Sequence, residues 1–407
     1  MAGFFTGLLG IVVLLGLAWL ISGNRKAINL GIVGAAFALQ AVVAAFVIYT
    51  PVGKAVIGKM SDGVLKVMGY SRDGIEFVFG GLATTEGIWS FAINVLPMIV
   101  FFSSLMSVLY HIGVMQIVVR MIGGALQWVI GTRPVESLNA AANIFIGQTE
   151  APLVVRPYLR TLSEPQLFAV MVSGVASIAG TVMLAYVQMG AELKYLLAAS
   201  FMAAPGGLLM AKIIMPDDET TADNKDRQLK MEASSHENVI LAAAVGAADG
   251  VKLAVNIGAM LVAFVALIAL FNGLVGGLAG LVGIEGLTLQ KMLGWLFAPI
   301  MFLLSIPWSE AQAAGALFGE KLILNEFVAF SHLTEYLAGM SDKTKAIVTF
   351  ALCGFANLSS IAILLGGLGT LVPEKKELIA RFGIKAVAAG SLSNLMSAAL
   401  AGILLSF

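Results

Sequence analysis

Charge is scarce in this chain of 407 residues: Lys and Arg number 24, Asp and Glu number 24, and together they make up 12% of the sequence. The net charge is zero and no long basic or acidic run occurs, so the chain has no electrostatic footprint for nucleic acid. Hydrophobic residues make up 59%, and the mean hydropathy of +0.94 is far above that of soluble domains. Apolar runs of about 20 residues, enough to cross a bilayer, recur throughout. The sequence therefore predicts an all-α integral membrane protein.

Residues with redox, metal-binding or nucleophilic chemistry are equally few. Cys353 is the single cysteine, which excludes an internal disulfide and any CxxC motif. The three histidines, His111, His236 and His332, are too scattered to suggest a metal site. No HExxH motif, nucleophile elbow or GxxxxGK[ST] loop occurs, so we expect neither a membrane-embedded enzyme nor an ATP-driven pump.

Eight apolar segments are predicted to cross the membrane: residues 4–22, 28–50, 90–116, 166–189, 193–214, 251–275, 344–371 and 384–406. The first has no Lys or Arg before it and is therefore expected to be a retained helix, not a signal peptide. Arg25 and Lys26 place the first loop inside, and hence the N-terminus outside. Residues 51–88 alternate charged, glycine and apolar residues, which favours interfacial helices. Residues 216–238 form the one hydrophilic loop.

Segment 133–159 is apolar but interrupted by the polar stretch NIFIGQTEAPLV. We expect a helix that starts near Thr132 and ends at Gly147, where a left-handed C-cap is easy. A second helix would start with Thr149 as its N-cap and Pro152 in its first turn. Each half spans about 18 Å at 1.5 Å per residue, too short to cross. The segment is therefore predicted to be a re-entrant hairpin.

Segment 295–332 follows the same plan. Pro307 and Ser309 would begin a helix, Gly319 would end it, and Asn325 would cap the next one with Glu326 in its first turn. The spans that follow the two hairpins also correspond, SGVASIAG (173–180) against CGFANLSS (353–360), at a nearly constant offset of about 180 residues. Three crossings separate the hairpins, so the second copy must be inverted. Inverted repeats with broken helices are typical of secondary transporters, which bind substrate where the repeats meet.

The polar residues of these segments indicate the kind of ligand. An ionised carboxylate at bilayer depth costs about 2.5 to 3.5 kcal/mol, and a helix N-terminus returns about 0.3 to 2 kcal/mol of that. Glu150 and Glu326 therefore need water, hydrogen-bond donors or a cation in a polar cavity between the repeats. Carboxylates beside Asn and Gln suit a neutral solute that carries hydroxyl and amide groups. Glu136, in the first turn of its half-helix, is instead expected to serve the helix dipole.

Freed backbone carbonyls at the hairpin tip and in the stretch SIAG (177–180) could hold a hard cation such as Na⁺. One plausible ligand set is Asn143, the Ile146 carbonyl, Ser177 and the Ile178 carbonyl, although spacing alone does not select it. Serines in membrane helices, Ser177 and Ser360 among them, are individually more often packing residues than ligands.

Four stretches carry a family resemblance: GQTEAPLVVRPYL (147–159), KLILNEFVAF (321–330), FALCGFANLSSIAIL (350–364) and SLSNLMSAALAG (391–402). In order and spacing they resemble the concentrative nucleoside transporters, in particular a bacterial, sodium-coupled member, from about residue 24 to the end. The resemblance implies a cation-coupled nucleoside symporter that forms a homotrimer. It also implies an elevator mechanism, in which each protomer moves a transport domain against a scaffold.

The resemblance also assigns residues. It implies that the nucleobase is held by Gln148, Thr149 and Glu150 and the ribose by Glu326, Asn357 and Ser360. Phe355 and Val182 would pack on the nucleoside, and Leu253 would contact the base from the scaffold. The Na⁺ ligands it implies are Asn143, Ile146, Ser177 and Ile178, the last three through carbonyls. The presence of Asn143 and Ser177 favours Na⁺ over H⁺ coupling.

The sequence thus predicts eight transmembrane helices plus two re-entrant helical hairpins in an inverted repeat, with interfacial helices. Residues 1–120 and 236–285 are assigned to the scaffold, and residues 130–215 and 290–407 to the two repeats of the transport domain. The expected function is Na⁺-driven nucleoside import across a bacterial inner membrane. A proton-coupled symporter is the first alternative and a channel for small polar solutes the second.

Overall fold

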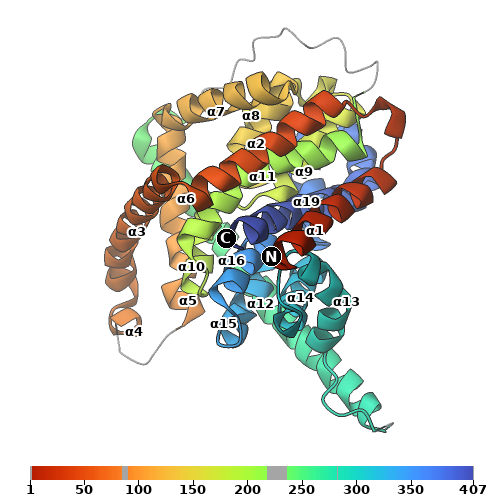
Figure 1. The fold of residues 1–407 in the computed structure, drawn as a ribbon. Coiled ribbons are helices and arrows are strands. Elements are labelled where there is room, and N and C mark those ends of the chain that lie inside the picture. The colour runs from red at the N-terminus through yellow and green to blue at the C-terminus, as the bar shows by residue number, and fades with distance from the viewer. Residues whose placement is uncertain (1, 85–89, 218–235, 282, 407) are drawn as a thin grey trace.

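The computed structural model describes residues 2–84, 90–217, 236–281 and 283–406 of the chain (Figure 1). Within these ranges every regular element is a helix and no strand occurs, which confirms the all-α class. Seven helical segments in the same ranges are long and apolar enough to cross a bilayer by themselves, against eight predicted. The remaining prediction, 344–371, is divided among the short helices α16 (Asp342–Leu352), α17 (Ser359–Gly366) and α18 (Leu368–Leu371).

The helices differ sharply in burial. The crossing segments of α9 (Glu164–Ala176) with α10 (Gly180–Gln188), and of α11 (Leu193–Ile214), are 94% buried, whereas that of α12 (Val239–Leu281) is 17% buried. The first two therefore form the core, and α12 is an outer helix. The other outer elements are α1 (Ala2–Leu20), η1 (Arg25–Ala27), α2 (Leu30–Tyr49), α3 (Pro51–Phe79), α4 (Gly81–Thr84), α5 (Phe91–Asn94), α6 (Leu96–His111) and α7 (Val114–Ile130).

The last helix of the chain is α19 (Lys376–Leu404), which follows the short helix η4 (Pro373–Lys375). Helix α1 packs on α19, so the two termini lie together (Figure 1). Helix α2 packs on α11 and α19, and Gln40 donates a buried hydrogen bond of 2.9 Å to Ser397. The first two helices are thereby attached to the core.

The predicted interfacial region is mainly one helix, α3, capped by the Thr50 hydroxyl, which accepts a hydrogen bond from the Gly53 N–H. Its position relative to a bilayer stays a prediction. The end of that region, residues 85–89, lies outside the described residues. Residues 218–235 of the predicted hydrophilic loop also lie outside them.

The sixth predicted crossing lies within a longer helix. Helix α12 has 43 residues, where 251–275 was expected. Asp249 and Lys252, at the start of the predicted crossing, form an ion pair of 3.0 Å. Their side chains are 58% and 74% exposed, so the charges lie on the surface of a helix that continues past them. The charged pair therefore does not end the helix.

The first hairpin differs in detail from the prediction. Its first arm, α8 (Pro134–Ala142), ends at Ala142 and not at Gly147. The tip leaves the helix early because its backbone bonds elsewhere: Phe145 O accepts a hydrogen bond of 3.0 Å from Gly180 N. The second arm, η2 (Ala151–Thr161), is a 3₁₀-helix with Glu150 at its N-cap, one residue after the expected Thr149. Pro157 and a kink at Val155 interrupt it.

The second hairpin consists of α14 (Trp308–Ile323) and α15 (Glu326–Leu337). Asn325 caps α15 as predicted, and its side chain accepts a hydrogen bond of 2.9 Å from Val328 N. Gly319 does not end α14. A Cβ at Gly319 would lie 2.6 Å from the Leu293 side chain of α13 (Leu289–Leu303), so the glycine serves close helix packing. Helices α13 and α14 meet at a bend of 118°.

A buried carboxylate joins the two arms of this hairpin. Glu320 on α14 is 0% exposed and lies 3.0 Å from the His332 ring on α15. It also accepts a hydrogen bond of 2.8 Å from Gln290 on α13, and Gln290 in turn accepts one of 3.0 Å from Asn272 on α12. This chain of side chains ties the hairpin to the long outer helix.

Candidate functional site

The two hairpin tips and the breaks in two core spans surround a single cavity. Helix α9 ends at Ala176, and α10 begins at Gly180; α16 ends at Leu352, and α17 begins at Ser359. All nine substrate residues named from the sequence line this cavity, namely Gln148, Thr149, Glu150, Val182, Leu253, Glu326, Phe355, Asn357 and Ser360. Glu150 and Glu326, 176 positions apart in sequence, therefore face a common space. That these residues bind substrate stays a prediction.

Glu326 is a buried carboxylate of the cavity that is held by two hydrogen bonds. It is 3% exposed and stands at the first position of α15, where the helix dipole favours a negative charge. The Tyr186 hydroxyl donates a hydrogen bond of 3.1 Å to its Oε1, and Asn357 Nδ2 donates one of 2.9 Å to its Oε2. These donors offset much of the cost of burying the carboxylate.

Tyr186 was not predicted from the sequence. It lies on α10, is 0% exposed, and stacks on Phe330 with ring centroids 4.4 Å apart. Within its own apolar run nothing marks it, because its partner Glu326 lies 140 residues later. A tyrosine in a buried core needs a partner for its hydroxyl, and this was the only signal that could have singled it out.

Asn357 and Ser360 form a rigid polar corner at the second break. Asn357 Oδ1 accepts hydrogen bonds from Ser360 N at 2.9 Å and from the Ser359 hydroxyl at 2.7 Å. These contacts fix the amide so that its Nδ2 points to Glu326. The Ser360 hydroxyl donates to Phe355 O and lies 3.3 Å from Gln148 Nε2 on the first hairpin. Gln148 therefore bridges the two repeats.

Two acceptors at the first tip remain open toward the cavity. Gln148 Oε1 is buried without a hydrogen-bond partner among the described residues. The Glu150 side chain is exposed, and its Oε2 accepts a hydrogen bond of 2.7 Å from Gly147 N, which closes the tip. Both groups can accept hydrogen bonds from a solute.

Apolar side chains make the remaining walls. Leu253, Ile257 and Met260 come from α12, and Val182 and Phe355 come from the two broken spans. The sequence analysis missed Ile257 and Met260, although they follow Leu253 at helical spacing on the same face of α12. The cavity thus offers polar groups from the two hairpins between flat or aliphatic surfaces. That combination suits a solute with a planar apolar ring and several hydroxyl groups.

The predicted ion ligands lie at the junction of the first tip and the first break. Asn143 is the C-cap of α8; its Nδ2 donates to Asn139 O at 2.9 Å, and its Oδ1 is buried without a partner among the described residues. Ser177 is the C-cap of α9, and its carbonyl accepts a hydrogen bond of 3.0 Å from Phe355 N. A carbonyl oxygen has a second lone pair, so this bond does not prevent ion binding. The unpartnered Asn143 oxygen fits a hard cation.

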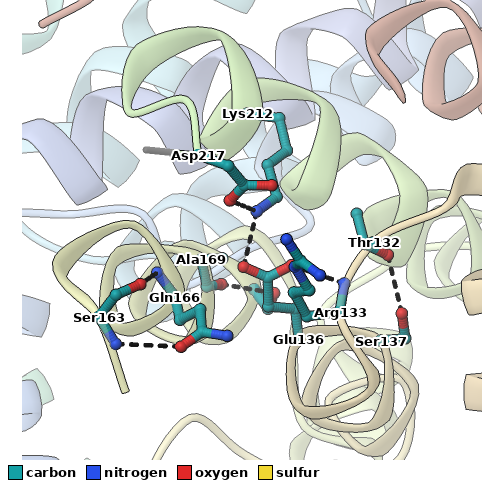
Figure 2. Close-up of polar contacts among 10 residues, drawn as sticks. Thr132, Arg133, Glu136, Ser137, Ser163, Gln166, Ala169, Lys212 and Asp217 are labelled. Carbon is teal, nitrogen blue, oxygen red and sulfur yellow. Dashed lines mark hydrogen bonds and ion pairs between the residues drawn. The ribbon is translucent and has the colours of Figure 1, made fainter. Parts of the chain in front are cut away.

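A buried ion pair fixes the base of the first hairpin (Figure 2). Glu136 accepts hydrogen bonds from Arg133 N at 3.0 Å, as a first-turn acid is expected to do, and from Lys212 Nζ on α11 at 2.7 Å. Lys212 also pairs with Asp217. Glu136 and the Lys212 side chain are 0% and 3% exposed. The prediction for Glu136 was therefore incomplete, because it also anchors the hairpin to the core.

Three family models match the chain in succession. They are described as Na⁺ dependent nucleoside transporter N-terminus (residues 9–82), nucleoside recognition (residues 92–193) and Na⁺ dependent nucleoside transporter C-terminus (residues 195–402). Together they cover nearly the whole chain.

Curated relatives and solved structures agree with these matches. The chain is 50% identical to the nucleoside permease NupC of Helicobacter pylori, over 97% of this chain and 96% of the relative. It is 37% identical to human sodium/nucleoside cotransporter 1, over 97% of this chain and 63% of the relative. The structure of CNTnw in an inward-facing substrate-bound state is 51% identical with a TM-score of 0.95, and covers 100% of this chain and 98% of that one. The structure of a double variant of CNTnw in an outward-facing state is also 51% identical, with a TM-score of 0.93, and covers 99% of this chain and 98% of that one.

Proposed function

The chain belongs to the Na⁺-dependent nucleoside transporter family, and from this premise we propose that it imports nucleosides as a secondary active symporter driven by a Na⁺ gradient. The observation that carries the proposal is the shared cavity. Each of the two hairpins presents a glutamate there, beside an unpartnered amide oxygen and apolar walls.

The arrangement of donors and acceptors suggests how a nucleoside would lie. The Glu326 carboxylate, oriented by Tyr186 and Asn357, would accept hydrogen bonds from ribose hydroxyls. Gln148 Oε1 and Glu150 would accept from the base edge, and Thr149 would add a hydroxyl. Phe355 and Val182 would pack on the nucleoside, with Leu253 against the base. Ser360 would help to hold the ribose.

Coupling would arise at the first tip. Na⁺ bound by Asn143 and the carbonyls of Ile146, Ser177 and Ile178 would fix the tip to the first break. Gln148, Thr149 and Glu150 follow directly in the chain, so ordering the tip would complete the base side of the cavity. The gradient supplies about 2.3 kcal/mol per charge per 100 mV, plus the concentration term of the ion. Relatives named sodium/nucleoside cotransporter support Na⁺ as the ion.

Transport would follow an elevator-type cycle in a homotrimer in a bacterial inner membrane. Residues 130–215 and 290–407 would move as the transport domain, together with α1 and α2, which pack on α19 and α11. The scaffold would then consist of the rest of residues 1–120 and of residues 236–285, so it would be smaller than the sequence predicted. Helix α12 supplies a wall of the cavity from the scaffold side, so such a movement would carry the hairpins along Leu253, Ile257 and Met260. Proton coupling is the alternative for the driving ion.

Uptake by proteoliposomes tests the proposal. Labelled uridine and adenosine would be followed with Na⁺ or choline outside, and separately with a pH gradient in the absence of Na⁺. We expect accumulation above the external concentration only with a Na⁺ gradient. Accumulation driven by the pH gradient alone would favour proton coupling. Equilibration without accumulation under every gradient would instead indicate a channel and contradict symport.

A further inference from the structure

Lys321, on α14, has one of the largest fully buried side chains among the described residues, at 0% exposure. Burying an ammonium group costs several kcal/mol unless its charge is compensated. No carboxylate of the described residues lies within ion-pair distance of Lys321. Its Nζ instead donates hydrogen bonds of 2.7 Å to Asn394 Oδ1 and 3.1 Å to Ala351 O. The ammonium is thus held by neutral oxygens, as a hard metal cation would be.

The Asn394 amide on α19 can take only one orientation. Its Nδ2 donates to Ala176 O at 2.6 Å and to Cys353 O at 2.9 Å, so its Oδ1 must face Lys321. Ala176 is the last residue of α9, and Cys353 is the C-cap of α16. One side chain therefore connects Lys321 to the breaks of both repeats.

The predicted inverted repeat gives Lys321 a counterpart in the first hairpin. With Thr149 aligned on Asn325, Lys321 falls at the position of Phe145, between the predicted Na⁺ ligands Asn143 and Ile146. The two junctions are also built alike. Phe145 O accepts a hydrogen bond of 3.0 Å from the first break, and Leu322 O accepts one of 3.1 Å from Leu358 N in the second. The first junction contains the unpartnered oxygen Asn143 Oδ1. The second junction contains the Lys321 ammonium, a cation that is part of the chain itself.

Lys321 also stands where its charge acts on the nucleoside cavity. Its acceptor Ala351 O belongs to the last turn of α16, where the helix dipole is negative and favours a cation. Lys321 and Glu326 flank the second tip, Lys321 near the end of α14 and Glu326 at the first position of α15. The break that follows α16 carries Phe355 and Asn357 into the cavity.

We propose that the Lys321 ammonium is a built-in cation of the second repeat, which holds the α16–α17 break and the second tip in the nucleoside-binding arrangement. It would do for the second repeat, as a group attached to the chain, what the coupled Na⁺ is proposed to do for the first. The inference rests on the proposed function and adds a positioning residue to it. Lys321 acts on the nucleoside through Asn394, the broken span and Glu326.

The test compares Lys321→Met and Lys321→Gln with the matched control Lys343→Met, whose lysine donates to Ser406 at the far end of α16. Titration calorimetry in nanodiscs would measure uridine affinity at saturating Na⁺, and Na⁺ affinity without uridine. We expect uridine affinity to fall about tenfold or more in both Lys321 variants, while Na⁺ affinity changes by less than about twofold. A packing defect alone would weaken the shorter Gln variant more than the Met variant, and would spread to Na⁺ binding.

A rescue experiment isolates the charge. Lys321→Ala leaves space for a small amine, so propylammonium should restore a large part of the uridine affinity, and 1-propanol of similar size should not. Uridine affinity within about twofold of wild type in the Met and Gln variants would overturn the inference, as would equal rescue by propanol. If all the neutral variants aggregate, the Lys321→Arg variant, which keeps the positive charge, is tested instead. A folded Arg variant that binds uridine supports the role of the charge, and any other result overturns it. Wild type that fails to bind uridine contradicts the proposed function itself.

Discussion

The Tyr186 hydroxyl donates a hydrogen bond of 3.1 Å to Glu326 Oε1, and this contact joins the first repeat to the tip of the second. Tyr186 is in turn fixed by the rings of Phe327 and Phe330, at centroid distances of 4.8 and 4.4 Å. The hydroxyl therefore arrives in one orientation. A carboxylate held in this way is already oriented before any ligand binds.

Tyr186→Phe should weaken uridine binding about tenfold, because a hydrogen bond to a charged group contributes about 1.5 to 3 kcal/mol. The ring packing is retained, so thermal stability should change little. Binding calorimetry at saturating Na⁺ measures the effect. Tyr195→Phe is the control, since that ring lies on α11 beside Phe350 and does not line the cavity. Equal losses in the two variants would contradict the role given to Tyr186.

Glu326→Gln should abolish accumulation of uridine. The amide keeps the shape of the carboxylate but removes one acceptor, so its NH₂ group must face the Tyr186 hydroxyl or Asn357 Nδ2. Glu310→Gln is the matched control, because Glu310 lies in the first turn of α14 and accepts hydrogen bonds of 3.0 Å from Ser341, away from the cavity. Proteoliposome uptake compares the two. Normal uptake by the Glu326 variant would remove it from the binding site.

The parts of this site that the sequence predicted are those with local signals. Asn325 before Glu326 is a helix N-cap pattern, and SIAG (177–180) combines small residues with a break in an apolar run. Such features depend on neighbours a few residues away. They placed both hairpin tips and the first break within a few residues of their positions in the structure.

The parts that the sequence could not predict depend on distant contacts. Lys321 meets Asn394 over 73 residues, and Lys212 meets Glu136 over 76 residues. No periodicity or cap encodes such a pair. In the sequence, Lys212 is a basic residue near the end of an apolar segment. The positive-inside rule accounts for such a residue without any partner. Only the fold shows that the Lys212 ammonium is buried and pairs with Glu136.

Asn143→Ala should raise the Na⁺ concentration needed for half-maximal uptake by about tenfold or more, since it removes the one side-chain amide proposed to bind the ion. Uridine affinity at saturating Na⁺ should stay close to wild type. Asn139→Ala is the control, one helical turn earlier on α8; its amide donates to Val170 O at 3.3 Å. If only the Asn139 variant changed the Na⁺ dependence of uptake, the ion would not be bound at Asn143.

Lys212→Met should destabilise the protein by about 3 to 5 kcal/mol, because it leaves the fully buried Glu136 without its partner. The double variant Glu136→Gln with Lys212→Met removes both charges and should recover much of that loss. Thermal unfolding in one detergent compares them. Arg381→Met breaks an ion pair with Glu164 whose side chains are 60% and 50% exposed, and should cost about 0 to 1 kcal/mol. A single Lys212 variant as stable as this control would show that the buried pair does not anchor the hairpin.

Gly354→Ala should abolish uridine binding, because the second break has no room for a methyl group. A Cβ at this position would overlap the Asn394 amide and lie 2.8 Å from Ala176 O, so α16 or α19 would have to shift. The shift would separate Asn394 from the two carbonyls that it joins and move Phe355 and Asn357 out of the cavity wall. Gly366→Ala on α17 is the control: nothing lies within 4 Å of its Cβ position, and alanine favours a helix by about 1 kcal/mol. Calorimetry and thermal unfolding of both variants give the answer. Uridine binding by the Gly354 variant at wild-type affinity would mean that the two breaks can separate without loss of the site.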